Sequence, residues 1–469
     1  TLAGAGPALT RLRVLAGANV DLIVNNMFAP AGTITNFNVN DLTLDGNATN
    51  QSPSAPEGFN IRLWGFTNSG MRNVWSVSPN TWGIRLEYGD GLVINNLVCK
   101  HGSQSNSDGI HLVDVDNVIG SNFDVFTSGD DAFVIEVANK TMLSGYALSN
   151  LRIRAPNALS LPARGLLLMA DPNVNIGDAR GMRNMSITNV AVAECSGAGI
   201  ICTGGIFENI HIQGTIDDCG YGLALAVGTP AFQGRMRNCS FKVDISRCKN
   251  TGFAGGTGTS VFCNDANGFF SSNHIVANIF EPAPSMTAVN LQGAVWTGEI
   301  NVNYPGSTNR PTNGIALTTT ACNLSVSVMG CVNGINIRPT ANGNHIKCGR
   351  VDGIGGDAIL VDATAANNTF TGGYINGTVN NAGFARFFGG AGIESDVNIS
   401  ATPNGSGEVT IDHTLVGTPR YIQVTLYGDN AATARVVSRT STSVTLRFFN
   451  SAGSAVTGVI VSGTVRSVL

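Results

Sequence analysis

Three aspartates in the first third of the sequence have a spacing that suits acid–base chemistry. Asp108 precedes a glycine, Asp130 and Asp131 are adjacent, and 23 positions separate Asp108 from Asp131. Carboxylates that share a small volume cannot all ionise at low cost, so the pKa of at least one of them rises. A protonated carboxyl beside an ionised one is the pair that hydrolysis of a glycosidic bond requires. The alternative is that each aspartate only forms a turn, as Ser107-Asp108-Gly109 and Ser128-Gly129-Asp130 would suggest.

A short repeated pattern bears on this choice. Each copy has five residues: the first varies, the second is usually small, and the third and fifth are apolar and flank a variable fourth residue. Copies occupy residues 59–63, 82–86, 108–112, 131–135, 164–168, 198–202, 221–225, 313–317, 333–337 and 357–361. A second strand signal with an asparagine near its start lies between copies, at residues 94–97, 120–123, 148–151, 183–185, 208–210 and 237–239. Each repeat therefore predicts one coil of a solenoid of short strands.

The repeat places the aspartates relative to one another. Asp108 and Asp131 begin consecutive copies, so we expect them on neighbouring coils about 4.8 Å apart. Asp130 joins them because it precedes Asp131 directly. An aligned trio favours a functional site over three separate turn residues.

The composition agrees with an array of strands. Glycine accounts for 58 of 469 residues and charged residues for only 12%, which is typical of short strands and tight turns rather than amphipathic helices. We predict an all-β chain in which residues 1–393 form a right-handed parallel β-helix. After a turn-rich linker at 403–407, alternating segments at 409–411, 421–426, 434–437, 443–448 and 459–465 predict a small antiparallel β-sandwich, and we assign residues 394–469 to this domain. The sandwich is expected to cap the solenoid and to serve in trimerisation or carbohydrate binding.

The ten cysteines do not predict a disulfide framework, because the chain is long and contains no Cys-x-x-Cys. Cys195, Cys219, Cys248 and Cys331 each precede a turn into a glycine-containing strand. We expect them to stack inside the coils as reduced thiols, although a redox or metal-binding role is the alternative. Neither a metal nor another cofactor is expected.

Charge and hydropathy exclude several partners. The net charge is −4 and the basic residues are scattered, so the chain has no electrostatic footprint for nucleic acid. No apolar run is long enough to span a bilayer, and we expect no membrane partner. The sequence begins Thr1-Leu2-Ala3-Gly4 without an initiator methionine, and we interpret it as a fragment of a longer protein.

Polar and aromatic residues are expected on the outer surface beside the aspartates. Strand alternation stacks Arg62, Arg85 and His111 in one outward column, and Trp64, Glu87 and Glu136 belong to the next. Tryptophan suits a sugar ring and arginine an acidic substituent, so the surroundings favour an acidic polysaccharide, although each residue alone fits an ordinary solvated surface. The predicted substrate-binding residues are His111, Arg85, Glu87, Arg62, Trp64, Glu136 and Arg164.

Two motifs resemble a known family. Asn106-Ser107-Asp108-Gly109 followed by Gly129-Asp130-Asp131 resembles the Asn-x-Asp and Asp-Asp motifs of polygalacturonase-like glycoside hydrolases. The stretch 42–46 resembles their early Asp-Gly strand. The resemblance implies that Asp108, Asp130 and Asp131 supply the acid and the base. The family's Gly-His-Gly and Arg-x-Lys motifs are absent from the following coils, where Arg152-Ile153-Arg154 and Arg164 are the nearest candidates.

The architecture resembles a second group. A β-helix followed by the segment 408–466 is similar to bacteriophage tailspike depolymerases with their C-terminal sandwich, a resemblance that covers nearly the whole chain. It implies a homotrimer on the virion, attached to the baseplate or tail through an N-terminal part outside this sequence. It also implies extracellular cleavage of a bacterial surface polysaccharide, either capsule or O-antigen.

Three functions remain open from the sequence. A hydrolase would use Asp131 or Asp108 as the acid and the other, with Asp130, as the base for water. A polysaccharide lyase would use His111 or a tyrosine to abstract a proton beside a uronate carboxylate held by Arg62 or Arg85. A receptor-binding adhesin would use the same groove without catalysis.

Overall fold

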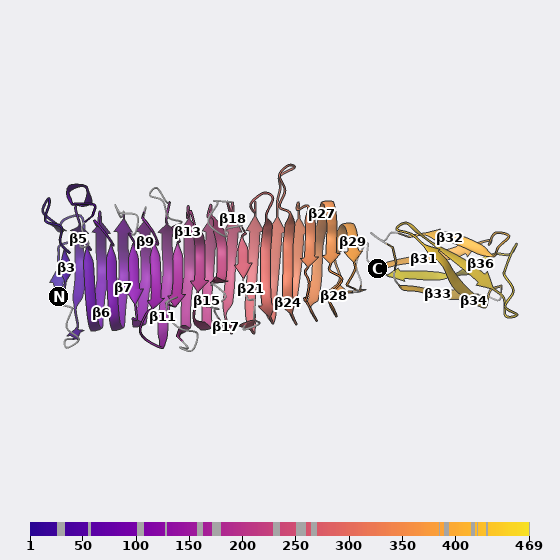
Figure 1. Cartoon of the computed structure of the whole chain (residues 1–469), viewed down its shortest axis with the longest axis horizontal. Coiled ribbons are helices and arrows are strands. Elements are labelled where there is room, and N and C mark those ends of the chain that lie inside the picture. Colours follow the sequence, from indigo (N-terminus) through magenta and orange to yellow (C-terminus); the bar gives the residue numbers. More distant parts are fainter. Residues whose placement is uncertain are drawn as a thin grey trace. The chain divides into compact units, whose positions relative to one another are not determined.

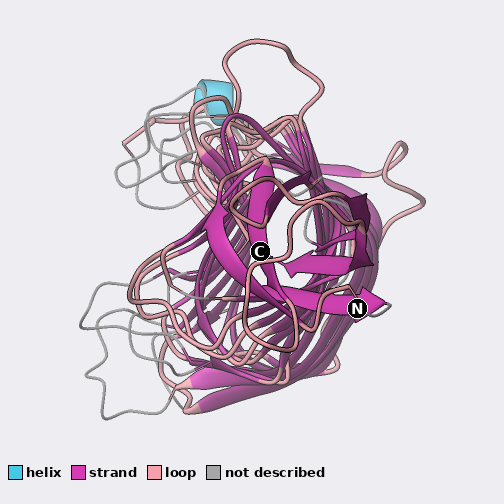
Figure 2. Ribbon diagram, turned by 90° about the vertical axis from the view of Figure 1, so that its right-hand side faces the viewer, coloured by secondary structure: helices cyan, strands magenta, loops and turns pink. Residues whose placement is uncertain are grey.

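The computed structural model describes residues 1–25, 33–54, 58–100, 107–126, 129–156, 163–170, 180–227, 235–249, 259–263, 270–383, 385–388, 394–413, 418–419, 421–427 and 430–468. Asn106 and Ser128 of the motifs above lie outside this range. The chain divides into two compact units, Thr1–Thr297 and Gly298–Leu469, and each is described by itself. Apart from one short 3₁₀ helix at Ala48–Asn50, the regular structure of the described residues is strand (Figure 2). Among these residues no helix has the length and hydropathy needed to cross a membrane.

The first unit is a parallel β-helix, as the repeat predicts. Strands of successive coils pair in parallel and follow one another in chain order (Figure 1). The strands are β1 (Leu2–Ala3), β2 (Arg11–Arg13), β3 (Ile23–Val24), β4 (Ile34–Thr35), β5 (Asn38–Asp45), β6 (Ile61–Val77), β7 (Ile84–Lys100), β8 (Ile110–Val113), β9 (Asp116–Phe126), β10 (Phe133–Val137), β11 (Met142–Arg154), β12 (Leu166–Ala170), β13 (Gly181–Ala193), β14 (Ala198–Thr203), β15 (Ile206–Asp217), β16 (Tyr221–Val227), β17 (Arg235–Arg237), β18 (Ser240–Ser246), β19 (Val261–Cys263), β20 (Phe270–Ser271), β21 (Asn273–Phe280), β22 (Thr287–Ala294) and β23 (Trp296–Asn303), the last of which contains the division between the units.

Two walls of this unit concern the candidate site. The short strands β8, β10, β12, β14, β16 and β19 pair in that order and, with the first residues of β6 and β7, form what we call the site wall. The longer strands β9, β11, β13, β15, β18 and β21 form a second wall. On the site wall Ile84 pairs with Ile110, and Ile110 pairs with Phe133. The copies at 82–86, 108–112 and 131–135 are therefore successive coils, as predicted.

Close packing between coils explains the residue types of the repeat. Ile84, Ile110 and Phe133 point inward and are fully buried. A Cβ atom at Gly109 would lie only 2.5 Å from the carbonyl oxygen of Ala132, so the position that follows Asp108 must be small.

The asparagines of the second strand signal form a ladder that begins on the later residues of β6 and β7 and continues on the second wall. Asn73, Asn96, Asn122 and Asn150 have φ angles of 53°, 56°, 62° and 56°, a left-handed conformation that asparagine tolerates better than most residues. The side-chain nitrogen of Asn96 donates to Asn73 at 2.9 Å, and that of Asn150 donates to Asn122 at 3.0 Å. These bonds tie coils together at the bends, which explains why the signal recurs.

All ten cysteines are free and buried, as the sequence analysis expected. Burial raises the pKa of the Cys248 and Cys331 thiols to about 12, so these side chains are protonated and behave as small apolar residues.

The second unit contains parallel coils and antiparallel sheets. Its parallel strands are β24 (Asn313–Thr320), β25 (Asn323–Met329), β26 (Asn333–Ile337), β27 (His345–Val361), β28 (Thr369–Thr371), β29 (Tyr374–Asn381) and β30 (Arg386–Phe388). Its antiparallel strands are β31 (Glu394–Ala401), β32 (Glu408–Asp412), β33 (Tyr421–Tyr427), β34 (Thr433–Arg439), β35 (Ser443–Phe449) and β36 (Val461–Val468). They form two three-stranded sheets, β31-β36-β33 and β32-β35-β34, around buried Leu446, Phe448 and Val465. The predicted sandwich is thus present, although the sequence did not reveal β31. The strand type changes between β30 and β31, while the domain boundary at 393/394 stays a prediction.

Candidate functional site

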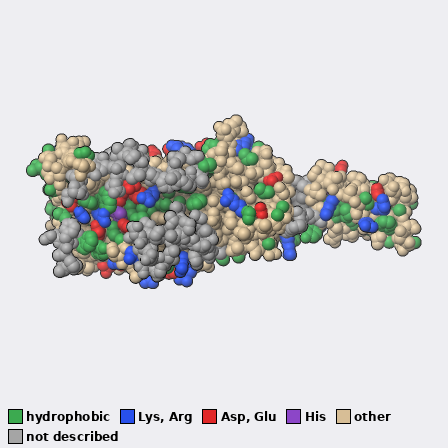
Figure 3. Space-filling model, viewed as in Figure 1, with side chains coloured by type: hydrophobic (Ala, Val, Ile, Leu, Met, Phe, Trp, Pro, Cys, Tyr) green, Lys and Arg blue, Asp and Glu red, His purple; other side chains and the backbone are tan. Residues whose placement is uncertain are grey.

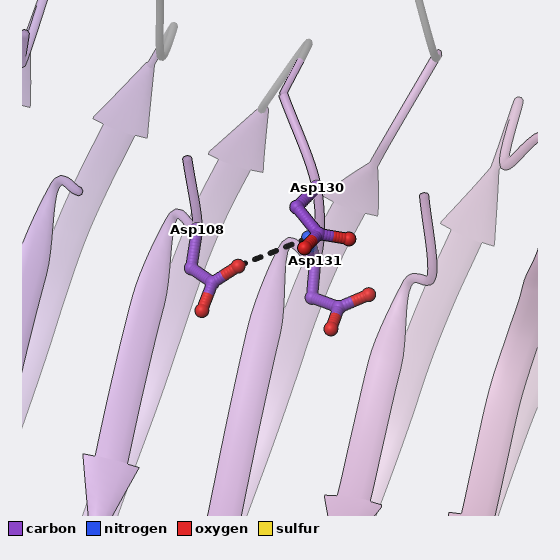
Figure 4. Close-up of side chains that lie close together, drawn as sticks. All are labelled: Asp108, Asp130 and Asp131. Carbon is purple, nitrogen blue, oxygen red and sulfur yellow. Dashed lines mark hydrogen bonds between the residues drawn. The ribbon is translucent and has the colours of Figure 1, made fainter. Parts of the chain in front are cut away.

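Asp108, Asp130 and Asp131 lie together just before the starts of two neighbouring strands of the site wall, β8 and β10. The backbone nitrogen of Asp131 donates to a carboxylate oxygen of Asp108 at 3.2 Å (Figure 4). Each of the three carboxylates offers an oxygen within 4.8 Å of the other two. The side chains of Asp108 and Asp131 are each 5% exposed, whereas that of Asp130 is 14% exposed. The coil register therefore brings the trio together, while its catalytic role stays a prediction.

His111 connects the trio to Glu136. Its Nδ1 lies 2.8 Å from Asp108 and its Nε2 lies 2.7 Å from Glu136. The Trp82 ring stacks on the imidazole with the centroids 4.9 Å apart. Burial opposes a charge on the ring, but the hydrogen bonds and charges of Asp108 and Glu136 outweigh it and raise the pKa of His111 to about 9. His111 is therefore an imidazolium at neutral pH that donates from both nitrogens.

Arg164 fixes the orientation of Asp131. Its guanidinium donates to the two carboxylate oxygens of Asp131 through Nε and Nη2, both at 2.6 Å. The backbone nitrogen of Arg164 adds a bond of 3.1 Å to the same carboxylate. This fork-to-carboxylate geometry needs an ionised acceptor and is among the strong hydrogen-bonding arrangements in proteins.

Asp130 and Asp131 titrate as a coupled pair. Burial raises the pKa of Asp130 to about 6, with a contribution from the charge of Asp108 and opposition from Arg164 and His111. Burial also raises the pKa of Asp131 to about 7, against the lowering effect of Arg164. Because the two bonds from Arg164 require an ionised Asp131, we place the shared proton on Asp130.

The remaining predicted residues follow the expected register but have partners of their own. In the strand register, Arg62 lies beside Arg85 of the next strand, and Arg85 lies beside His111 of the strand after that. Arg85 contacts the carboxylate of Glu87 and lies 4.4 Å above the Trp82 ring.

Two of these residues do not contact the trio. Arg62 lies 4.0 Å from Asp21, and Trp64 packs against Tyr88 with the ring centroids 4.4 Å apart. His111, Glu136 and Arg164 thus form one network with the aspartates. Arg85 and Glu87, on β7, border this network through Trp82. Arg62 and Trp64 lie one coil further away, on β6.

The structure also shows features that the sequence reading missed. Trp82 occupies the position of Asp108 one coil earlier, so the repeat could have placed it beside the site. His111 was expected in an outward column, where the strand register pairs it with Val134, but both side chains are buried, at 6% and 1% exposed. Beyond Val134 the same column contains buried Leu167 and Ala224. Acidic, basic, histidine and hydrophobic side chains gather on one face of the strands (Figure 3).

The three aspartates are also the kind of oxygen ligands that a hard divalent cation binds. Both oxygens of Asp131 already accept from Arg164, and one oxygen of Asp108 faces His111. Asp108 and Asp131 thus already have cationic partners from the protein, and we propose no metal here.

Replacing Arg164 by Gln should change the pH dependence of any reaction at this site. The guanidinium lowers the pKa of Asp131, so its loss raises that pKa and leaves more of the carboxylate protonated. We expect the acidic limb of the pH–rate profile to move to higher pH, with activity at pH 6 reduced by about tenfold, since one pKa unit changes the ionised fraction tenfold below the pKa. Arg183→Gln, at an exposed position on β13, is the control and should leave the profile unchanged. An unshifted limb in Arg164→Gln would contradict this role.

Comparisons with known proteins find similar folds among solved structures, whereas no protein-family model and no curated protein matches the sequence. The tailspike protein of Pseudomonas phage LKA1 is 11% identical, with a TM-score of 0.39, and the match covers 93% of this chain and 67% of that one. The tailspike protein of E. coli bacteriophage HK620, solved in complex with a pentasaccharide, is 10% identical, with a TM-score of 0.39 and coverage of 98% and 80%. The A-module of an Azotobacter vinelandii mannuronan C-5 epimerase is 14% identical, with a TM-score of 0.39 and coverage of 79% and 82%. The assignment of the parallel β-helix rests on the strand pairings described above.

Proposed function

We propose that this protein is a depolymerase that hydrolyses glycosidic bonds in a bacterial surface polysaccharide. The observation that carries the proposal is that three carboxylates from neighbouring coils lie close together. Cationic side chains of the protein hold two of these carboxylates in place. His111 holds Asp108, and Arg164 holds Asp131. Glycoside hydrolysis uses two carboxyl groups, one as the acid and one as the base, and their different surroundings give them these different roles.

The geometry favours one division of roles. Asp130 is the most exposed of the three and carries the shared proton, so it is suited to protonate the departing glycosidic oxygen. Asp108, which faces His111, and Asp131, which accepts two bonds from Arg164, are the carboxylates left to accept a proton from the water that attacks the anomeric carbon. In the overall reaction, the bond from that carbon to the departing oxygen is replaced by a bond to the oxygen of water. This assignment differs from the sequence-based expectation, in which Asp131 or Asp108 was the acid.

The same observations disfavour a lyase that uses His111 as its base. β-Elimination needs an unprotonated base, but both nitrogens of His111 face carboxylates and its pKa is raised to about 9. It also needs a cation for the uronate carboxylate, and the two candidates, Arg62 and Arg85, already face Asp21 and Glu87.

We further propose that the depolymerase is a homotrimeric phage tailspike that acts on capsule or O-antigen outside the host cell. The order of parallel coils followed by two antiparallel sheets supports this setting. Attachment to the virion would use a part of the protein outside this sequence. Sedimentation equilibrium should give a species of three chains, and any other stoichiometry would contradict the trimer.

Incubation with a panel of purified capsular polysaccharides and O-antigens tests the reaction itself. We expect one or more polymers to shorten in size-exclusion chromatography, with products whose mass includes one added water per cleavage. Products with the ultraviolet absorbance of an unsaturated sugar would identify a lyase instead. A polymer that retains the protein but keeps its length would identify an adhesin.

A further inference from the structure

We propose that the sugar units on either side of the cleaved bond are uncharged, an inference that rests on the function proposed above. It concerns the substrate class and departs from the sequence-based expectation of an acidic polysaccharide. The supporting observation is that four cations of the site wall all have carboxylate partners: Arg62, Arg85, His111 and Arg164.

The two cations that contact the trio both have carboxylate partners. Arg164 donates twice to Asp131, and His111 lies between Asp108 and Glu136. A substrate carboxylate would have to displace one of these protein carboxylates from its partner. The displaced group would then be left buried and unpaired, which is strongly unfavourable.

The two arginines on the neighbouring coils are engaged as well. The guanidinium of Arg85 contacts the carboxylate of Glu87 and lies over the Trp82 ring. Arg62 lies 4.0 Å from Asp21 and its guanidinium carbon lies 4.9 Å from the centre of the Phe59 ring. Only about a quarter of each side chain is exposed, with values of 25% for Arg62 and 24% for Arg85.

The charges of this part of the site wall do not balance. Four cations, Arg62, Arg85, His111 and Arg164, face six carboxyl groups, those of Asp21, Glu87, Asp108, Asp130, Asp131 and Glu136. A further negative charge would meet a surface that is already acidic, with the repulsion weakly screened at buried positions.

The segments of the first unit that lie outside the described residues add no lysine or arginine to this set. These segments are 26–32, 55–57, 101–106, 127–128, 157–162, 171–179, 228–234, 250–258 and 264–269.

The same groups suit an uncharged sugar. Hydroxyl groups donate hydrogen bonds to carboxylates, and the half-buried ring of Trp64 offers apolar surface to a sugar ring. A neutral hexose, a deoxyhexose or an N-acetylhexosamine has this chemistry.

The test uses matched polymers. The panel contains neutral and uronate-containing surface polysaccharides, and each of the latter is also supplied after chemical reduction of its carboxyl groups to alcohols, which keeps the linkages. The units at both new chain ends are identified by mass spectrometry. We expect neutral units at both ends and, for any uronate-containing polymer that is cut, cleavage that survives reduction with less than about a threefold change in rate.

A uronate at either new end would overturn the inference while leaving the proposed hydrolase in place. So would loss of cleavage on reduction on the order of a hundredfold or more, the response of a site built to bind a carboxylate. If no polymer is cut, the proposed function fails, and the inference is judged by retention of the protein on the same immobilised polymers. Retention that needs the carboxyl groups overturns it, retention that survives reduction supports it, and no retention at all overturns it together with the proposed function.

Discussion

Asparagine in place of Asp108, Asp130 or Asp131 is expected to slow polysaccharide cleavage by about 10²- to 10⁴-fold, the range that a general acid or base contributes. Asparagine keeps the shape of the side chain but cannot donate or accept the transferred proton. At position 108 it also removes the charge that faces His111, and at position 131 it removes the ionised acceptor of Arg164. The rate is measured as the release of reducing ends from a polymer that the unchanged protein cuts.

Structural damage has to be separated from lost chemistry in these variants. Thermal unfolding and sedimentation should show that the variants keep the fold and the assembly of the unchanged protein. Asp90→Asn, at an exposed carboxylate on β7 that accepts from Asn117 at 2.7 Å, is the matched control and should cut at the normal rate. Full activity in both Asp108→Asn and Asp131→Asn would place the site elsewhere.

The coil register could be predicted from sequence because each coil repeats the same packing problem. The inward positions are apolar and close packing favours a small residue before them, so Gly83, Gly109 and Ala132 mark successive coils. Once Asp108 and Asp131 share a position in the repeat, their proximity follows from the spacing between strands. The columns that pair Arg62 with Arg85, and Arg85 with His111, follow in the same way.

Side-chain partnerships could not be predicted in this way. Glu136 is one column away from His111 and one coil further along, and only the actual rotamers show that it accepts from Nε2 at 2.7 Å. The burial of His111 and Val134 depends on what covers the outer face, which the repeat does not encode. Arg62 and Arg85 were expected to be available to a substrate. The repeat shows where they lie, but it does not show that the carboxylates of Asp21 and Glu87 reach them. Strand β31 was missed because its pairing with β36 joins segments far apart in the sequence.

His111→Gln is expected to remove a large part of the pH dependence of stability above neutral pH. The pKa of His111 is raised from 6.5 to about 9 in the folded protein, a rise that corresponds to about 3 kcal/mol of stability. Because the folded-state pKa is the higher one, this stability is fully present below pH 6.5 and is lost as the pH rises through about 9. Between pH 7 and pH 9.5 the unchanged protein should therefore lose about 2 kcal/mol more than the variant.

Equilibrium unfolding in urea, followed by tryptophan fluorescence at several pH values, measures this difference. Thiols and tyrosines also titrate toward high pH, but they are the same in both proteins and cancel in the comparison. His274→Gln provides a matched control, because His274 is exposed on the second wall and its ring bonds to Thr297 at 3.1 Å; it should follow the unchanged protein. Equal losses in the unchanged protein and His111→Gln would mean that the imidazole is neutral. The ring could then serve as a base, and the argument against a lyase would lose its main support.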